Sequence, residues 1–595
     1  MVAAVATAVA LAVAGTWAVS SFRRAPPAEV PAVHLSLNPP ERGQFIFGNS
    51  IGGIALSPDG RTAAFVAFRN GITSLWVMNL DGSPATSLPG TRGAAYPFWS
   101  PDSRFIAFFS DGKLRRVEKN GGAPLTICEV GWPRGGAWMS DRRILFGSMT
   151  AGLFVVPDSP GTPSSLTTLD ASRGETSHRW PQVLPGGRFL YFVQSGKAET
   201  QGIYAASFAT PTKAAKLVSA GANGLYAPGG DGRGHLLWLL GGTLVAQELD
   251  LATLALTGES HQIADPVTSV GITNQMNVAA PAGGMLLYSA ISTPGQLTWI
   301  DRAAPGKTPL DVIGEPGEYG VFRLSPDGSR IVTMRDRPGG FDLWLLAVER
   351  GVSSKFSSDS STRVYPVWSP DGRTIVFTLT PSRNLHRRDS SGAGADLRLI
   401  PSPLPQYATD WSGDGRSLLY WENAKATGRD LWILPVTPDG TPVPDTAPRP
   451  YLRTPANESW GRFSPEPVPR WVAYQSDETG SFEIYIDAFP TPRGKKQIST
   501  AGGTYPQWGA GGRELFYVSP DFTLMVVDLK ATANGLEPSA PSELFPLPAV
   551  DVGYSPYEVT PDGRRFLVLA TPEHSVPQPL TVIVNWPALL KEEKR

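Results

Sequence analysis

The sequence is poor in the residues that build covalent cross-links and metal centres. Its 595 residues include one cysteine, Cys128, and six histidines. A single cysteine excludes an intramolecular disulfide, and so few histidines argue against a multi-histidine metal site. An excess of charge is lacking too, since 52 basic residues balance 53 acidic ones. Because nucleic-acid binding calls for a basic surface, we expect no nucleic-acid partner.

Glycine and proline, by contrast, are abundant, with 63 and 57 residues. Both residues break helices, so long helices are not expected. Disordered chains can be equally rich in them, but such chains are poor in aromatic residues. This chain carries 17 Trp, 16 Tyr and 25 Phe, and 41% of its residues are hydrophobic. The composition therefore predicts a turn-dense, all-β protein with packed cores.

The N-terminal residues form a separate segment. Residues 2–22 carry no charge and are followed by Arg23 and Arg24. About 20 apolar residues span a bilayer, so we interpret residues 1–24 as a transmembrane helix that anchors the chain. A cleaved signal segment is the alternative, although its basic n-region is missing. Residues 25–44 are rich in proline and predict a linker.

A turn motif, Ser-Pro-Asp-Gly, recurs through the rest of the chain. Proline fixes φ at the first turn position, aspartate bonds to nearby backbone, and glycine accepts positive φ. Twelve copies recur at a mean spacing of about 46 residues, a repeat length typical of propeller blades. The position of the aspartate falls at Asp59, Asp102, Asp141, Gly186, Asp231, Ala282, Asp327, Asp371, Asp414, Glu466, Ala510 and Asp562.

The residues around each turn predict four short strands. In the clearest copy, residues 368–377 read WSPDGRTIVF, with a β run after the turn. A second run follows about ten residues later, as at residues 431–433, and further turns lead to a last short strand. A unit of this length with four antiparallel strands is typical of a β-propeller blade.

Twelve blades exceed one ring, because propellers usually have four to eight. We therefore predict tandem β-propellers in a six-plus-six arrangement, over residues 45–310 and 311–595, with seven-plus-five as the alternative. Residues 33–37 predict an additional strand. It can complete the twelfth blade by pairing with the last strand, at residues 580–586, which would remove two exposed sheet edges.

These repeats resemble the TolB-like, WD40-like propeller repeats of bacterial envelope proteins. Residues 96–117 and 169–193 also resemble the C-terminal propellers of acidobacterial-type membrane serine/threonine protein kinases. In that family a kinase domain precedes one membrane helix and the propeller region. The resemblance implies a chain in the bacterial inner membrane with periplasmic propellers. The positive-inside rule, applied to Arg23 and Arg24, favours the opposite orientation.

Motifs for catalysis are incomplete. Residues 386–389 read HRRD like a kinase catalytic loop, but the Gly-rich loop and the Asp-Phe-Gly motif are absent. Residues 48–52 match Gly-x-Ser-x-Gly, yet they lead straight into the first propeller turn and not into a helix. Propellers also accompany peptidase domains, but few residues follow the twelfth repeat. We therefore expect no enzyme activity, no cofactor and no metal.

The residues that precede several turns are the candidate site. A Tyr-Pro-x-Trp pattern occurs at Tyr96, Tyr365 and Tyr505, and His178 and Arg179 occupy the equivalent place in the fourth repeat. Since the innermost strand of a blade begins there, these five side chains are candidates to face a ligand or partner at a channel mouth. The alternative is a packing role for the aromatic residues and a structural hydrogen bond for His178.

Three functions fit these observations. The first is a membrane-anchored, non-catalytic propeller scaffold that binds a protein or ligand in the cell envelope. The second is the sensor portion of a receptor-type serine/threonine kinase whose catalytic domain is missing from this chain. The third is the propeller of a prolyl-oligopeptidase-like peptidase without its hydrolase domain.

Overall fold

The computed structural model describes residues 30–595 except for a set of short gaps and the last residue. The gaps are residue 42, residues 48–51, 70–71, 230–233, 271–272, 291–294 and 307–310, residues 338–339, 360, 381 and 425–426, and residues 533–534, 549–553 and 571–577. The expected anchor at residues 2–22 and most of the Gly-x-Ser-x-Gly motif lie outside the described residues. None of the helices found within those residues is long and apolar enough to cross a bilayer.

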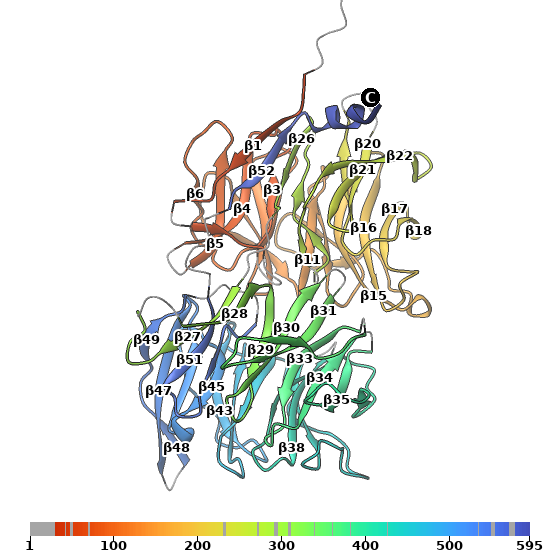
Figure 1. Ribbon diagram of the computed structural model, residues 1–595. Coiled ribbons are helices and arrows are strands. Elements are labelled where there is room, and N and C mark those ends of the chain that lie inside the picture. Colours follow the sequence, from red (N-terminus) through yellow and green to blue (C-terminus); the bar gives the residue numbers. More distant parts are fainter. Residues whose placement is uncertain are drawn as a thin grey trace, which may run out of the picture.

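The described chain is all-β, as predicted, and its sheets are antiparallel with mostly four strands (Figure 1). Three short 3-10 helices accompany them: η1 (Ala171–Arg173), η2 (Ala510–Gly512) and η3 (Trp586–Lys594). Figure 1 shows the sheets in two bodies, one above the other, with the C-terminus at the far end of the upper body.

The upper body contains the first group of sheets. Their strands are β2 (Gly43–Phe45), β3 (Ile54–Leu56), β4 (Thr62–Arg69), β5 (Ile72–Asn79) and β6 (Thr86–Ser87); β7 (Ala95–Trp99), β8 (Phe105–Ser110), β9 (Lys113–Glu118) and β10 (Leu125–Glu129); β11 (Pro133–Trp138), β12 (Arg143–Ser148), β13 (Phe154–Pro157) and β14 (Ser164–Ser165); β15 (Glu175–Leu184), β16 (Arg188–Ser195), β17 (Gly202–Ser207) and β18 (Thr210–Val218); β19 (Leu225–Pro228), β20 (Gly234–Leu240), β21 (Thr243–Asp250) and β22 (Ala255–Ala264); and β25 (Val278–Ala279), β26 (Met285–Tyr288), β52 (Leu580–Val584) and β1 (Val33–Leu37). A small hairpin, β23 (Ser269–Val270) and β24 (Gln275–Met276), belongs to the same body.

The lower body contains the second group. Its strands are β50 (Tyr557–Val559), β51 (Arg565–Ala570), β27 (Gly295–Asp301) and β28 (Asp311–Gly317); β29 (Tyr319–Leu324), β30 (Arg330–Arg337), β31 (Gly340–Ala347) and β32 (Ser353–Lys355); β33 (Arg363–Trp368), β34 (Thr374–Leu379), β35 (Asn384–Asp389) and β36 (Leu397–Arg398); β37 (Gln406–Trp411), β38 (Ser417–Ala424), β39 (Gly428–Pro435) and β40 (Arg449–Leu452); β41 (Glu458–Phe463), β42 (Trp471–Ser476), β43 (Glu483–Ala488) and β44 (Lys496–Gln497); and β45 (Thr504–Gly509), β46 (Glu514–Val518), β47 (Thr523–Thr532), β48 (Gly535–Pro538) and β49 (Ser542–Pro546).

The chain passes between the two groups twice. After β26 it enters the second group, where β27 and β28 form the outer strands of the sheet that β50 and β51 complete. It then returns to the first group as β52, between β26 and β1. These exchanges cross the predicted boundary between residues 310 and 311. Residues 295–301 lie before it but pair in the second group, and residues 580–584 lie after it but pair in the first.

The predicted pairing of residues 33–37 with the last strand is found. β1 and β52 are antiparallel, from Val33 opposite Val584 to Leu37 opposite Leu580. The position of this pair differs from the expectation, since it completes the sheet of the sixth repeat and not that of the twelfth. Strand alternation explains the fit: Val582 packs into a core with Phe65, whereas Ile583 points to the other face and packs with Leu286.

The turn chemistry of the repeats is as predicted. At Asp371 the Oδ1 atom accepts hydrogen bonds from the Ser369 hydroxyl at 2.6 Å and from the Arg373 backbone N–H at 3.0 Å. Gly372 follows with φ +69°. The same pattern recurs at Asp59, Asp102, Asp327, Asp414 and Asp562. These aspartates therefore have a local structural role, each within its own turn.

Candidate binding channel

The innermost strand of several sheets contains a bulge that places an aromatic residue in the left-handed region. In β7 the register shifts between Ala95 and Phe98, and Tyr96 has φ +52°. Bulky residues rarely adopt positive φ, which costs about 1–2 kcal/mol per residue. The same conformation occurs at Trp180, Tyr365, Trp460 and Tyr505. Strain that recurs at equivalent positions marks this end of the blades as a place to look for function.

These strained ends lie where the two groups of sheets meet. The guanidinium of Arg429, on β39 of the second group, stacks on the ring of Trp132, just before β11 of the first group, with 3.8 Å between its carbon and the ring centroid. The Ser-Pro-Asp-Gly turns lie at the opposite ends of the inner strands. We call the region around Trp132 and Arg429 the junction.

The three candidate tyrosines pack against aromatic neighbours at the junction end of their strands. Tyr96 is 3% exposed and meets Trp180 edge-to-face, with ring centroids 4.9 Å apart. Tyr365 and Tyr505 are only partly buried. Tyr365 lies 5.0 Å from Tyr407 and 6.1 Å from Trp460, and Tyr505 lies 5.0 Å from Trp460. The structure thus brings Tyr365 and Tyr505 into one aromatic cluster, and places Tyr96 in another.

The tryptophans of the Tyr-Pro-x-Trp pattern connect neighbouring blades. The Nε1 atom of Trp368 donates to the carbonyl of Arg323, and that of Trp508 donates to the carbonyl of Arg462, at 3.1 and 3.0 Å. Trp99 makes the same bond to Ala55 at 3.3 Å. The predicted packing role of these tryptophans is therefore confirmed.

His178 and Arg179 are buried and bonded inside the first group. His178 Nδ1 lies 2.7 Å from the Thr167 hydroxyl, and its Nε2 lies 3.1 Å from Glu175 Oε2. Arg179 donates from Nη1 to Asn274 Oδ1 at 2.6 Å. Asn274 follows β23 in the small hairpin, which also accepts a bond from Trp180 Nε1 at the Thr273 carbonyl, at 2.7 Å. Both candidates therefore hold neighbouring elements together, and their role toward a ligand stays a prediction.

The Thr167, His178 and Glu175 side chains have the order of a hydroxyl–imidazole–carboxylate triad. Thr167 is 4% exposed, and its hydroxyl already accepts the backbone N–H of Leu153 at 2.8 Å. Equivalent hydroxyls accept the same type of bond in other blades. The Thr91 hydroxyl accepts the backbone N–H of Leu75, and the Ser499 hydroxyl accepts that of Ile484. The hydroxyl is thus a repeated structural group. The HRRD motif likewise lies on a blade strand, β35, as predicted.

A channel of about 890 Å³ runs along the inner strands of the first group. It reaches from Tyr96 and Trp180 near the junction to turn residues such as Asp141. Six sheets contribute to its wall through β3, β7, β11, β15, β19 and β25, and Gln275 and Met276 of β24 add to it. Apolar residues such as Ala55, Phe98 and Ala137 make up more of its wall than polar ones, which include Gln182 and Asn223. These sizes and this composition are typical of small-ligand pockets.

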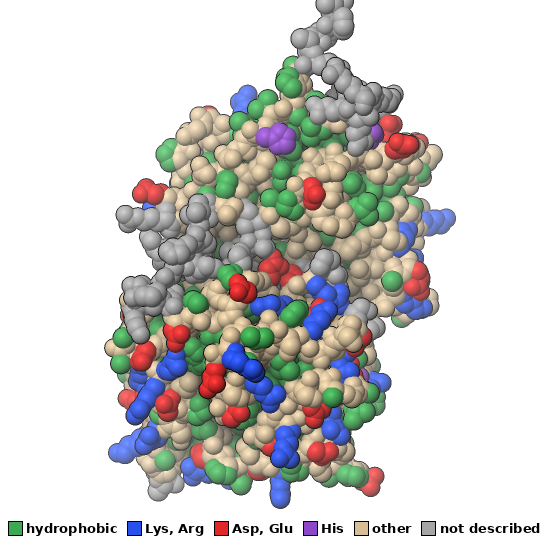
Figure 2. Space-filling model, in the orientation of Figure 1, with side chains coloured by type: hydrophobic (Ala, Val, Ile, Leu, Met, Phe, Trp, Pro, Cys, Tyr) green, Lys and Arg blue, Asp and Glu red, His purple; other side chains and the backbone are tan. Residues whose placement is uncertain are grey.

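Most of the equivalent positions of the second group are charged. The residue two places before the first turn position is Ala55, Phe98 or Ala137 in three repeats of the first group. In four repeats of the second group it is Arg323, Asp410, Arg462 or Glu558, and in the other two it is the neutral Val367 or Gln507. In the view of Figure 2, charged side chains are also denser over the second group than over the first. The two groups thus repeat one fold with different chemistry along the inner strands.

Glu558 holds these charged residues together. Its Oε1 atom lies 2.6 Å from Arg323 Nη1 and 2.8 Å from Arg462 Nη2. Gln507 Nε2 lies 3.3 Å away. Burial, followed by repulsion from Arg462, lowers the pKa of Arg323 to about 10. β45 lies between β41 and β50 in the order of the blades. The Arg462–Glu558 ion pair therefore joins two blades that are separated by a third.

Sequence reasoning identified Tyr96 at the junction end of the channel, but not the other lining positions or the charged residues at the equivalent positions of the second group. A signal was present, because both sets occur at one fixed distance before each turn. Arg429 at the junction was also missed, since no repeat pattern distinguishes it from surface arginines.

No protein-family model matches the chain. A stretch of 145 residues is 28% identical to the uncharacterized peptidase YuxL of Bacillus subtilis, over 23% of this chain and 20% of that protein. The chain thus spans a fifth of the length of this curated relative. Among solved structures, a putative TolB from Agrobacterium tumefaciens is 18% identical with a TM-score of 0.36, over 47% of this chain and 98% of that one.

Two further solved structures are similar at a comparable level. TolB from Acinetobacter baumannii is 11% identical with a TM-score of 0.31, over 51% of this chain and 80% of that one. The tricorn protease is 12% identical with a TM-score of 0.30, over 86% and 63%. TolB proteins are therefore among the solved structures that this chain resembles, in line with the resemblance of its repeats.

Proposed function

We propose that the protein is a non-catalytic double propeller that binds a ligand or partner segment in the axial channel of its first propeller. The proposal includes two rings of six blades. It is supported by the grouping of the sheets, six of which line the channel of the first group. In each ring, one blade is completed by strands from distant parts of the chain, which joins the two ends of the ring in one sheet.

The observation that carries the proposal is the difference between the inner strands of the first group and those of the second. Small and apolar residues leave a channel of about 890 Å³ in the first group, whereas an ion-pair network bridges the inner strands of the second. A wall with more apolar than polar surface favours a ligand, or a side chain of a partner, with an apolar part. The proposal assigns no catalytic role to Thr167 and His178, because both side chains are engaged in structural hydrogen bonds.

A neutral fluorescent probe tests the channel. We expect N-phenyl-1-naphthylamine to bind saturably, and Ala137→Trp to weaken this binding at least ten-fold, because the larger ring fills the space beside Phe98. Ala123→Trp adds the same ring on an exposed loop and serves as the matched control. Fluorescence titration gives both affinities. Equal binding by the two variants would show that the probe does not enter the channel.

The cellular setting is part of the same proposal. Residues 2–22 would anchor the propellers in the inner membrane, on its periplasmic side, and a link to a receptor-type kinase rests on the sequence resemblance. We expect the chain in the membrane fraction, and protease added to spheroplasts to digest the propellers. Deletion of residues 2–22 should release the chain into the soluble fraction. Protection from the protease would contradict the periplasmic orientation.

A further inference from the structure

Buried arginines in this protein fall into two classes. Five described arginines are buried: Arg134, Arg179, Arg323, Arg363 and Arg429. A buried guanidinium normally has a carboxylate partner, because removing an unpaired charge from water is costly.

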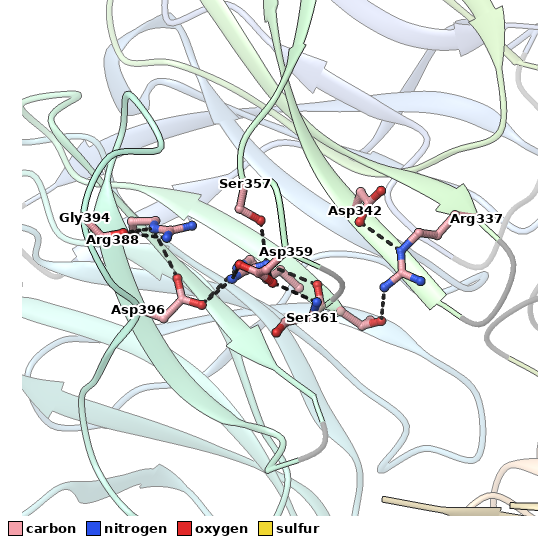
Figure 3. Close-up of polar contacts among 10 residues, drawn as sticks. Arg337, Asp342, Ser357, Asp359, Ser361, Arg388, Gly394 and Asp396 are labelled. Carbon is pink, nitrogen blue, oxygen red and sulfur yellow. Dashed lines mark hydrogen bonds and ion pairs between the residues drawn. The ribbon is translucent and has the colours of Figure 1, made fainter. Parts of the chain in front are cut away.

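Arg363 is a buried arginine with carboxylate partners. It binds Asp359 through two nitrogens, at 3.0 and 2.8 Å, and Asp396 through Nε at 3.1 Å. The surrounding contacts are drawn in Figure 3, where Arg388 also approaches Asp396. The Ser357 hydroxyl accepts from Arg363 Nη1 at 2.7 Å, and the Ser361 backbone N–H donates to Asp359 Oδ1 at 2.8 Å. Arg363 therefore needs no further anion.

Arg134 and Arg429 lack such partners. Neither forms an ion pair with any described residue, and the Nε atom of each has no hydrogen-bond acceptor there. Arg134, which is 4% exposed, donates from Nη1 to the carbonyl of Pro133 at 2.7 Å. Arg429, which is 9% exposed, donates from Nη1 to the Ser459 hydroxyl at 3.1 Å. Arg134 also donates from Nη2 to Met149 Sδ at 3.5 Å. The Nε–H donor of each guanidinium group is left buried without an acceptor.

The two arginines come from different groups of sheets, and Trp132 links them at the junction. Arg429 stacks on Trp132, two residues before Arg134. Burial raises the pKa of Tyr365, and both Arg429 and Arg134 lie close enough to oppose this rise. Arg179 and Arg383 add further positive charge, since Arg134 and Arg383 contribute, after burial, to lowering the pKa of Arg179.

We propose that the junction binds a small oxyanion, a phosphate or carboxylate group, between Arg134 and Arg429. The anion would accept hydrogen bonds from the free donors of both guanidinium groups, and such charge-assisted bonds are about twice as strong as neutral ones. It would also connect β11 of the first group with β39 of the second. The bound anion thereby fixes the two propellers relative to each other.

Inorganic phosphate is the probe for this site. We expect saturable phosphate binding by titration calorimetry, and a rise in Tm over chloride buffer of equal ionic strength. Arg134→Met and Arg429→Met should each weaken phosphate binding at least ten-fold and abolish it together. In phosphate-free buffer the double variant should be at least as stable as the native protein, because it removes two unpaired buried charges.

Arg564→Met is the matched control, since it removes one positive charge from a side chain that is 83% exposed. Phosphate stabilises many proteins without binding, so the Tm of native, control and double variants must be compared in the same buffers. An equal rise in all three would overturn the proposal.

Malonate in a parallel titration identifies the preferred group, since tighter phosphate binding assigns a phosphate and tighter malonate binding a carboxylate. The channel variant Ala137→Trp should leave phosphate binding unchanged, so that this site and the proposed channel can fail separately.

Discussion

Substitution of Glu558 by alanine is expected to lower the free energy of unfolding of the second propeller by about 3–5 kcal/mol. The carboxylate lies within 2.8 Å of two arginines, and the residue is 7% exposed. Its removal leaves Arg323 without an ion-pair partner among the described residues. Arg462 keeps Asp410, at 3.7 Å. An unpaired buried charge, more than the lost attraction itself, accounts for the size of this effect.

Two further variants separate charge from packing. Glu558→Gln keeps the shape of the side chain, so most of the loss should remain if the negative charge is what matters. Combining Glu558→Leu with Arg323→Met and Arg462→Met should recover stability, since well-packed apolar residues often replace buried ion networks without cost. Urea unfolding followed by tryptophan fluorescence measures each variant. Glu543→Ala, on an exposed position of β49, should change stability by less than about 0.5 kcal/mol.

A loss below about 1 kcal/mol in Glu558→Ala would mean that water or a shift of Asp410 compensates for the missing carboxylate. The network would then be a minor element of the second propeller. The inner strands of the two groups would still differ in their residues, but the ion pairs of the second group would contribute little to its stability.

Local chemistry explains why much of the fold could be predicted. The Ser-Pro-Asp-Gly turns depend on residues a few positions apart, and Asp371 makes the backbone bond that its sequence position predicts. The pairing of β1 with β52 was also predictable, because a lone strand at each end of a repeat array has an unpaired edge.

The exchange of strands between the groups could not be read from the sequence. β27 carries the ordinary alternation of a blade strand, and nothing in residues 295–301 distinguishes β51 as its partner from β26. Sheet partners are chosen by the whole ring, since a strand fits any neighbour that offers a matching apolar face. The same limit applies to the junction: Arg429 reaches Trp132 because of how the two groups are stacked.

The strained aromatic residues show a third kind of limit. Tyr96 and Tyr365 precede prolines and read as strand ends, and a bulky residue gives no local signal for positive φ. Glycine takes the equivalent place in the third repeat, where Gly135 has φ +76° and a Cβ atom would lie 2.4 Å from the ring of Trp180. The sequence located these positions, whereas the surrounding aromatic packing determines their conformation.

A chain that ends at Pro579 is expected to lose the folded first propeller while keeping the second. β52 lies between β26 and β1, so its removal leaves β1 without a partner strand and β26 with β25 alone. It also removes Leu580, Val582, Ile583 and Trp586, which are at most 4% exposed. Burial of each such side chain contributes roughly 1.5–3 kcal/mol, so the sum approaches the total stability of an ordinary domain.

Hydrogen exchange distinguishes the two propellers in this experiment. Amides of β1, β25 and β26 should exchange rapidly in the shortened chain, and those of β33 to β46 should keep their protection, because residues 295–570 supply every strand of the second group. A chain that ends at Leu590 retains β52 and Trp586 and is the matched control. Ile583→Asp in the full chain places a charge in the same core and should reproduce the loss. Native protection of β1 and β26 in the shortened chain would show that the ring closes without β52, and the exchange of strands would then not be what holds the first propeller together.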